Sequence, residues 1–291
     1  MNPIRTFDEA IALVTGAASG IGKAVSEELA ARGAEVILAD VDDAEPVAAA
    51  IRARGGKATA ARLDVTDAAA FKALVDRAFA ERGRLDYLFN NAGIAVAAET
   101  QDHTLEAWRK IVEVNLMGVV HGVQAAYPGM LRQGFGHIVN TASTAGLLPS
   151  PGITSYTATK HAVVGLSRAL RAEGALHGVR VSAVCPGPIR TAILSGGRHG
   201  VLLFALPEAE QRKFISELFE MLRPLDAGVF ARRLLDQVAR NRGIIVIPGV
   251  WKLMWWLDRL SPALSGWIAR KGFEQMRRRL DERIAAIQPR R

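Results

Sequence analysis

Cysteine is nearly absent from the chain. Cys185 is the single one among 291 residues, so no disulfide can form within the protein, and its position at the end of an apolar segment indicates a structural role. The first residues, Met1 to Arg5, also lack the apolar stretch of a secretory signal peptide. Both absences favour a reducing, cytoplasmic location over an extracellular one.

A long apolar run is absent too. Pro248 and Lys252 interrupt the longest one, which stays below the roughly 18 residues needed to cross a bilayer. The composition, 49% hydrophobic and 23% charged, is that of an ordinary globular core, and no linker divides residues 1–247. We therefore expect one large domain, residues 1–249, followed by an extension, residues 250–291.

The net charge of +8 is unevenly distributed. Residues 250–291 hold ten Lys and Arg against four Asp and Glu, a balance of +6, whereas the other 249 residues hold 27 against 25. The nearly neutral body makes nucleic-acid binding unexpected, because such binding needs a broad basic surface.

Short apolar segments alternate with helical segments through the domain. Predicted strands cover Ile11–Thr15, Glu35–Asp40, Ala58–Leu63, Leu85–Asn90, His137–Thr141, Arg180–Cys185 and Gly243–Ile247. Predicted helices cover Lys23–Arg32, Ala44–Arg54, a stretch after Asp67, Thr104–Leu131, residues 155–176 and Asp226–Arg240. This alternation predicts an α/β fold, a parallel sheet of about seven strands covered by helices on both faces.

A glycine-rich turn, Gly16 to Gly22, joins the first strand to the first helix with the spacing G-x3-G-x-G. Strand, turn and helix in this order place backbone N–H groups where a pyrophosphate would bind; a tight turn without a ligand is the alternative. Asp40 ends the second strand about twenty residues later, at the position of a ribose-binding carboxylate. Asp42 and Asp43 follow without a neighbouring base, and three acids would repel a 2′-phosphate, so NAD is favoured over NADP; a solvated acidic loop is the other interpretation.

Ser143, Tyr156 and Lys160 form the pattern Ser-x12-Tyr-x3-Lys. On a helix, Tyr156 and Lys160 lie one turn apart on the same face, where the ammonium would lower the phenol pKa from its usual value of about 10. Ser143 follows an apolar strand and could donate to a carbonyl oxygen at the same place. The trio therefore predicts a proton donor with a second hydrogen-bond donor for the substrate, although a Tyr-x3-Lys pair alone is common on helix surfaces.

Asn115 lies within a helix that is apolar on nearly every side. It is either a core asparagine with satisfied hydrogen bonds or an active-site group that holds a water. The helix containing Tyr156 is similarly apolar beyond Lys160, which suggests that both helices pack against a second subunit across a two-fold axis.

Together, these motifs resemble the short-chain dehydrogenase/reductase family over about residues 8–248. The resemblance implies a Rossmann-type doubly wound sheet and a catalytic tetrad of Asn115, Ser143, Tyr156 and Lys160, with no metal ion. It implies that Tyr156 exchanges a proton with the substrate oxygen while hydride moves to or from nicotinamide. Ser143 would bind that oxygen, Lys160 would hold the ribose hydroxyls and lower the Tyr156 pKa, and Asn115 would place a water. The implied cofactor-binding residues are Gly16, Ser19, Gly20, Ile21, Gly22, Asp40, Asp64, Val65, Asn91, Ala92, Gly93, Tyr156, Lys160, Pro186, Gly187, Ile189 and Thr191.

Two stretches depart from the family pattern. Residues 192–223 mix glycines with apolar residues and suggest a lid over an apolar substrate, or a disordered loop. The extension contains four of the five tryptophans, a predicted helix from Val250 to Leu260, Ser261-Pro262 as a cap and first turn, and then an amphipathic basic helix. Such a helix can lie on the inner membrane surface, or it can pack on the domain or a second subunit with its arginines solvated.

We therefore expect an NAD-dependent oxidoreductase that acts on a hydrophobic secondary alcohol or ketone, with lipid-like and steroid-like molecules as candidates. We expect it to form a homodimer or homotetramer. A non-catalytic NAD-binding interaction protein is the alternative, and a nucleic-acid binder that uses the basic extension is a weaker third.

Overall fold

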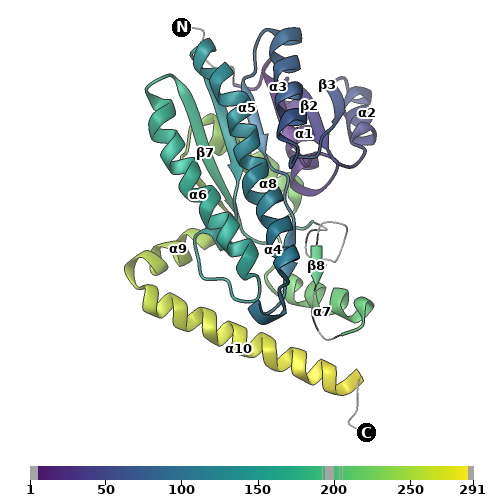
Figure 1. The fold of residues 1–291 in the computed structure, drawn as a ribbon, viewed down its shortest axis with the longest axis vertical. Coiled ribbons are helices and arrows are strands. Elements are labelled where there is room, and N and C mark those ends of the chain that lie inside the picture. Colours follow the sequence, from purple (N-terminus) through teal and green to yellow (C-terminus); the bar gives the residue numbers. More distant parts are fainter. Residues whose placement is uncertain (1–5, 192, 194–199, 203, 205, 288–291) are drawn as a thin grey trace.

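The computed structural model describes residues 6–191, 193, 200–202, 204 and 206–287. Its centre is the predicted parallel sheet of seven strands, and the structure shows their order to be β3-β2-β1-β4-β6-β7-β9 (Figure 1). The strands are β1 (Ile11–Thr15), β2 (Glu35–Asp40), β3 (Lys57–Arg62), β4 (Tyr87–Asn90), β6 (Gly136–Thr141), β7 (Val179–Pro186) and β9 (Ile244–Ile247). The direction of winding reverses between β1 and β4, and in such sheets ligands bind in the crevice at the carboxyl ends of the strands flanking this point.

Helices cover both faces of the sheet. The buried residues of α1 (Gly20–Ala31), α2 (Glu45–Ala53) and α8 (Ala227–Ala239) form one core cluster with Ala12 and Val14 of β1. Those of α3 (Ala68–Arg82), α5 (Gly118–Gln133) and α6 (Thr154–Ala175) form the other with Ile11 and Leu13. Successive residues of β1 therefore serve opposite cores, which is why this strand is buried at every position.

The predicted helix Thr104–Leu131 is interrupted in the structure. Thr104 caps α4 (Leu105–Val112), a π turn covers Glu113–Met117, and α5 continues to Gln133. The interruption falls on Asn115, so the prediction of one regular helix was wrong where a polar side chain is turned into the core. A π turn inside a helix is frequent at functional sites.

Five elements outside the central sheet were not predicted. β5 (Ala95–Ala97) pairs with β8 (Gly200–Leu202) in a two-stranded parallel sheet, and α7 (Glu208–Met221) follows it. Two 3-10 turns, Thr100–Asp102 and Thr144–Gly146, lie in loops nearby. α7 falls within the predicted lid, residues 192–223; several of the lid's other residues lie outside the described part of the chain.

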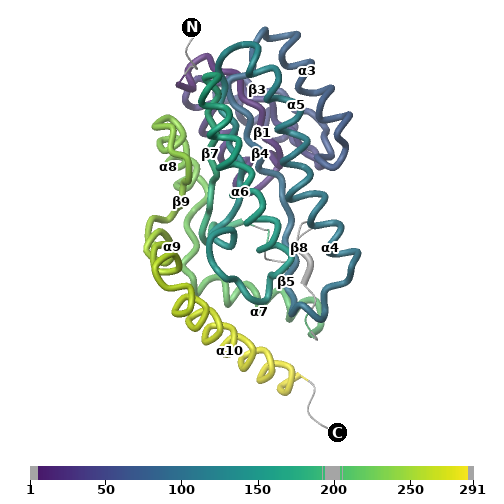
Figure 2. The backbone as a smooth tube through the Cα atoms, turned by 60° about the vertical axis from the view of Figure 1, so that its left-hand side comes forward, coloured from purple at the N-terminus to yellow at the C-terminus, as the bar shows by residue number. Residues whose placement is uncertain are grey.

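The extension forms two helices, α9 (Val250–Leu260) and α10 (Pro262–Ile287). Ser261 and Pro262 separate them as predicted, with the Ser261 hydroxyl accepting from the Leu264 N–H at 3.4 Å. α9 lies beside β9 at the edge of the sheet, and α10 then runs past α7 at the end of the domain (Figures 1 and 2). None of the described helices is both long enough and apolar enough to cross a membrane.

Candidate active site

The glycine turn after β1 is built for close backbone approach. Gly16 and Gly20 have φ of +67° and +53°, a region that favours glycine. A Cβ atom on Gly22 would lie 2.0 Å from the Gly16 carbonyl oxygen, so α1 starts tight against the turn. Ser19 precedes α1 without a side-chain capping bond within the described residues, and no acid lies in the first helical turn. The N–H groups and positive dipole end of α1 can therefore receive an anion such as a pyrophosphate.

The loop after β4 is tied to the same turn. The Thr15 hydroxyl accepts hydrogen bonds from the N–H groups of Asn91 at 3.0 Å and Ala92 at 3.1 Å. The Asn91 amide donates in return to the Thr15 carbonyl at 3.0 Å. A Cβ atom on Gly93 would lie 3.2 Å from the Asn115 Oδ1 atom and 3.5 Å from the Lys160 ammonium nitrogen. This loop thus joins the predicted cofactor turn to the predicted catalytic group.

Asp40 faces the glycine turn from the end of β2. Its carboxylate accepts from the Ala18 N–H at 2.8 Å and from the Asp42 N–H at 2.9 Å. Arg62 stands opposite Asp40 in the ladder between β2 and β3. The residues next to Asp40 in the sequence include no Lys or Arg, so the position of Arg62 becomes visible only from the strand register.

Asp64 and Val65 follow β3 and have different environments. Asp64 is exposed, and its carboxylate accepts from the backbone and hydroxyl of Thr66 at 2.9 and 2.8 Å. Val65 is buried, and a Cβ atom on Gly118 would lie 2.8 Å from its side chain. Asp64 can therefore meet a ligand, whereas Val65 shapes the wall behind it.

The structure brings Ser143, Tyr156 and Lys160 together. Tyr156 and Lys160 share one face of α6, and the Lys160 nitrogen lies 5.4 Å from the centre of the Tyr156 ring. Ser143, after β6, donates a hydrogen bond to the Tyr156 phenol. Lys160 is 3% exposed and donates to the Thr141 carbonyl at 2.9 Å, and its burial lowers its pKa to about 8.

The Tyr156 pKa was expected to be lowered, but in the structure it is raised. Burial raises the pKa of Tyr156, the bond from Ser143 opposes the shift, and the neighbouring Cys185 adds to it. The cost of placing a phenolate in this desolvated site thus outweighs the stabilisation that the protein's own groups provide.

Asn115 is completely buried on the π turn. Its side-chain oxygen accepts from the Ile94 N–H at 2.8 Å, and its amide donates to the Ile94 carbonyl at 2.9 Å and to the Thr159 hydroxyl at 3.4 Å. Each polar side-chain atom therefore already has a protein partner. The contacts fit a satisfied core asparagine that holds the loop after β4, and a role in placing a water stays a prediction.

The stretch after β7 closes the other side of the crevice. Gly187 donates its N–H to the Ile247 carbonyl at 2.8 Å, and Ile189 is buried. A Cβ atom on Gly20 would lie 3.3 Å from Thr191, so this stretch reaches the glycine turn. A Cβ atom on Gly187 would lie 2.6 Å from the indole nitrogen of Trp251. The extension thus lies against the predicted cofactor-binding residue Gly187. Beyond the unusual tryptophan content of the extension, nothing in the sequence indicated this contact.

Cys185 is completely buried at the end of β7, and burial raises the pKa of its thiol to about 12. A backbone hydrogen bond from Ser143 to the sulfur opposes that shift. A neutral thiol that contacts the Ser143 backbone fits the structural role predicted for this residue.

The helix α7, which falls within the predicted lid, is attached to α10. Leu280 packs with Phe214 and Ile215 in a separate apolar cluster. Arg283 pairs with Glu217 at 2.9 Å and with Glu210 at 3.2 Å. Elsewhere on α10, Arg277 pairs with Glu99 and Arg279 contacts Met221. The expectation that the arginines are merely solvated was therefore wrong for these three, because α10 packs across two segments that the sequence could not place.

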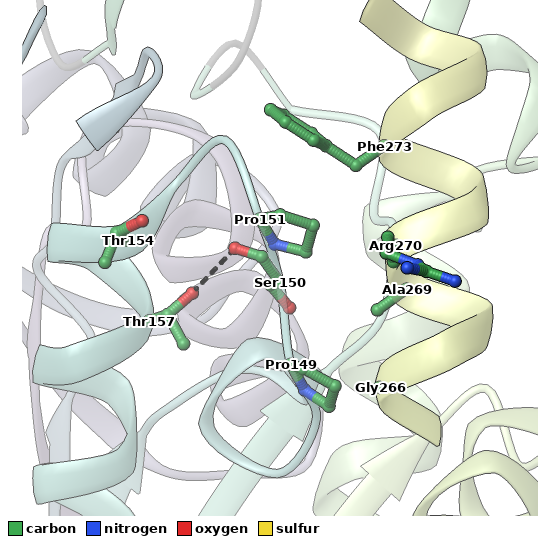
Figure 3. A pocket seen from close by; sticks show the side chains of 9 residues that line it. All are labelled: Pro149, Ser150, Pro151, Thr154, Thr157, Gly266, Ala269, Arg270 and Phe273. Atoms are coloured by element: carbon green, nitrogen blue, oxygen red, sulfur yellow. Dashed lines mark hydrogen bonds between the residues drawn. The ribbon is translucent and has the colours of Figure 1, made fainter. Parts of the chain in front are cut away.

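Two surface hollows border α10. One, of about 390 Å³, lies between α10 and the Pro149–Thr157 segment, with Phe273 and Ala269 on the α10 side (Figure 3). The other, of about 530 Å³, lies between α7 and α10. Neither includes Tyr156 or Lys160, so both lie outside the predicted catalytic group.

Comparison with known proteins supports these motifs. A family model described as short chain dehydrogenase matches residues 10–200. The chain is 40% identical over 192 residues to the cyclohexanol dehydrogenase of Acinetobacter sp. (strain SE19), which covers 65% of this chain and 76% of that protein. It is 43% identical over 192 residues to the cis-4-hydroxycyclohexanecarboxylate dehydrogenase of Sinomonas cyclohexanicum, covering 65% and 77%. A crystal structure of a short chain dehydrogenase/reductase from Burkholderia phymatum in complex with NAD superposes with a TM-score of 0.78 and 34% identity, covering 89% of this chain and 96% of that one.

Proposed function

The chain belongs to the short-chain dehydrogenase family, and on that premise we propose that it moves a hydride between NAD and a hydrophobic secondary alcohol, with Tyr156 carrying the proton. The observation that carries the proposal is the contact of Tyr156 with both Ser143 and Lys160 beside a glycine turn fit for a pyrophosphate. When bound, NAD supplies the acceptor for the hydride.

The protein's own groups handle the substrate oxygen. In alcohol oxidation, Tyr156 accepts the hydroxyl proton as the carbon loses its hydride, and Ser143 donates a hydrogen bond to the same oxygen. Lys160 stabilises the negative phenolate from its position beside the ring. In ketone reduction the steps reverse, and the raised pKa of Tyr156 keeps the phenol protonated and ready to donate near neutral pH.

The cofactor preference rests on Asp40. Its carboxylate, held by Ala18 and Asp42, would accept a ribose hydroxyl and repel a 2′-phosphate. Arg62 beside it favours NADP in principle, but Asp40 is anchored to the turn that would hold the pyrophosphate. This supports NAD as the preferred cofactor.

The substrate class follows from the relatives and from the lid. Both named relatives are dehydrogenases of cyclohexane-ring alcohols. In this chain α7, within the predicted lid, buries Phe214 and Ile215 against Leu280 of α10. We extend the proposal to ring alcohols with apolar substituents.

NADH absorbance tests the proposal directly. Purified protein is given NAD⁺ or NADP⁺ with cyclohexanol, substituted cyclohexanols, sterols and open-chain secondary alcohols. Turnover of ring alcohols with NAD⁺ is expected. NADH binding without turnover of any alcohol or matching ketone would instead support a non-catalytic NAD-binding protein.

The assembly is proposed from the outer faces of α5 and α6. Tyr127, Leu131 and Leu166 remain only partly buried there, which suits pairing with a second copy. Sedimentation at micromolar protein should give a dimer or tetramer, and a monomer would remove this part of the proposal.

A further inference from the structure

The extension carries an exposed apolar stripe along α9 and the first half of α10. Its members, which we name the α9–α10 stripe, are Val250, Leu253, Trp256, Leu260, Leu264, Trp267 and Ile268. Leu260 is 81% exposed and Trp256 is 56% exposed, which is unusual for side chains of this size.

The stripe follows one face of each helix. Val250, Leu253, Trp256 and Leu260 recur every three or four residues along α9, and Leu264, Trp267 and Ile268 share a face of α10. The opposite face of α9 is occupied, since Trp251 and Trp255 pack with the domain core. Elsewhere in the described chain, large exposed apolar residues occur singly, as at Leu105 and Leu176, or in the one adjacent pair Met221 and Leu222.

Basic side chains flank the stripe. Lys252, Arg259, Arg270 and Lys271 are exposed along the same two helices. Glu274 pairs with Arg270 and Lys271, but the extension as a whole keeps a balance of +6, while the remainder is nearly neutral. Two copies of this surface facing each other would bring like charges together, whereas an anionic surface would complement both the apolar face and its flanks.

We propose that the α9–α10 stripe docks this protein on the surface of an anionic lipid bilayer. Trp256 and Trp267 have the apolar ring and polar N–H that suit the headgroup boundary, and the leucines between them enter the acyl region. Lys252 and Lys271 lie against lipid phosphates and carboxylates. The helices lie on the membrane and do not cross it.

The other half of α10 gives this docking a consequence for the enzyme. The helix that carries Trp267 at one end binds the lid helix through Leu280 and Arg283 at the other. Docking therefore holds the lid side of the domain near the lipid. Docking does not depend on the proposed activity, and each can be present without the other.

Vesicle co-sedimentation tests the proposal with the full chain. Vesicles of phosphatidylcholine alone are compared with vesicles that also contain phosphatidylserine. Binding to the anionic vesicles should be stronger by about tenfold or more and should weaken as salt is raised. Absence of binding, or equal binding to both vesicle types, would overturn the proposal.

Paired variants separate the stripe from general surface hydrophobicity. Leu253→Gln/Leu260→Gln removes residues that are 65% and 81% exposed, and Leu105→Gln/Leu176→Gln removes residues that are 72% and 84% exposed far along the chain. Circular dichroism and thermal melting establish that both variants fold. The first pair should lose anionic-vesicle binding by about tenfold or more, and the second pair should keep it. Equal losses in the two variants would contradict the proposal. So would a wild-type protein that does not bind vesicles but self-associates with rising concentration, if the first pair of substitutions abolishes that self-association.

Discussion

Burying the Lys160 ammonium costs the apo protein stability, so removing it should stabilise the fold while abolishing activity. Burial lowers the Lys160 pKa from its ordinary 10.5 to about 8, a shift that corresponds to about 3 kcal/mol. Lys160→Met also removes the donor to the Thr141 carbonyl, which costs about 1 kcal/mol. The variant should therefore be about 2 kcal/mol more stable near pH 7, with a Tm about 4 °C or more above wild type.

The stability difference between Lys160→Met and wild type should change with pH in a direction that a change in packing alone would not produce. Between about pH 8 and 10.5 the unfolded lysine holds a proton that the folded one has lost, so wild-type stability rises with pH over this window. Below about pH 8 both states are protonated and the full penalty is present. The advantage of Lys160→Met should thus be largest near neutrality and shrink as pH rises through the window.

Urea unfolding of the NAD-free protein at several pH values measures this directly. Lys110→Met, at an exposed helical lysine, is the matched control and should change stability by less than about 0.5 kcal/mol. A Lys160→Met variant that is less stable than wild type at neutral pH would refute the reasoning. So would an advantage that does not diminish above pH 8.

The remaining predictions concern cofactor choice, pH and the lid. Asp40→Ala should lower the NAD-over-NADP ratio of kcat/KM by about tenfold or more, because a charge that repels the 2′-phosphate is lost. Asp76→Ala, at an exposed acid on α3, is the control, and an unchanged ratio in Asp40→Ala would remove Asp40 from cofactor selection. The rate of alcohol oxidation should rise from neutral to alkaline pH and the rate of ketone reduction should fall, because burial raises the pKa of the Tyr156 phenol. Initial rates in both directions test this, and an oxidation rate that falls as pH rises would contradict it. Burial lowers the pKa of His137 to about 3, so only the unfolded chain takes up a proton on this histidine as pH falls below about 6.5. Urea unfolding should therefore show that the free energy of unfolding falls by about 2 kcal/mol by about pH 5, and His137→Gln should not show this fall. Arg283→Gln should raise KM about threefold or more with kcat little changed, whereas Arg278→Gln should not; equal KM values would separate the lid contact from substrate binding.

Local sequence signals predicted much of the fold. β1 and β2 were predicted with their observed bounds, and α6 within one residue, because periodicity and glycine placement act over neighbouring residues. The spacing of Tyr156 and Lys160 placed them on one helical face, as observed.

What the sequence could not predict depends on contacts between distant residues. The π turn at Asn115 exists because this side chain turns inward to hold Ile94, and nothing in the helix pattern marks that partner. The three-residue strands β5 and β8 pair across about a hundred residues, too short for any periodicity to register. Arg62 stands opposite Asp40 only through strand register, and Trp251 lies near Gly187 only because the extension folds back.

The direction of the Tyr156 pKa shift was also beyond the sequence. A helical spacing predicts that a cation is near, but not how far the phenol is removed from water. Desolvation is a property of the packed site, and here it exceeds the opposing effect of Ser143 on the Tyr156 pKa.

Turnover by Tyr156→Phe tests the central claim most directly, because the change deletes one hydroxyl from the group formed with Ser143 and Lys160. NADH formation from a ring alcohol should fall by at least about a hundredfold, while NADH binding, followed by its fluorescence, should stay close to that of the wild type. Turnover within tenfold of wild type, with intact NADH binding, would contradict the claim that this phenol carries the proton.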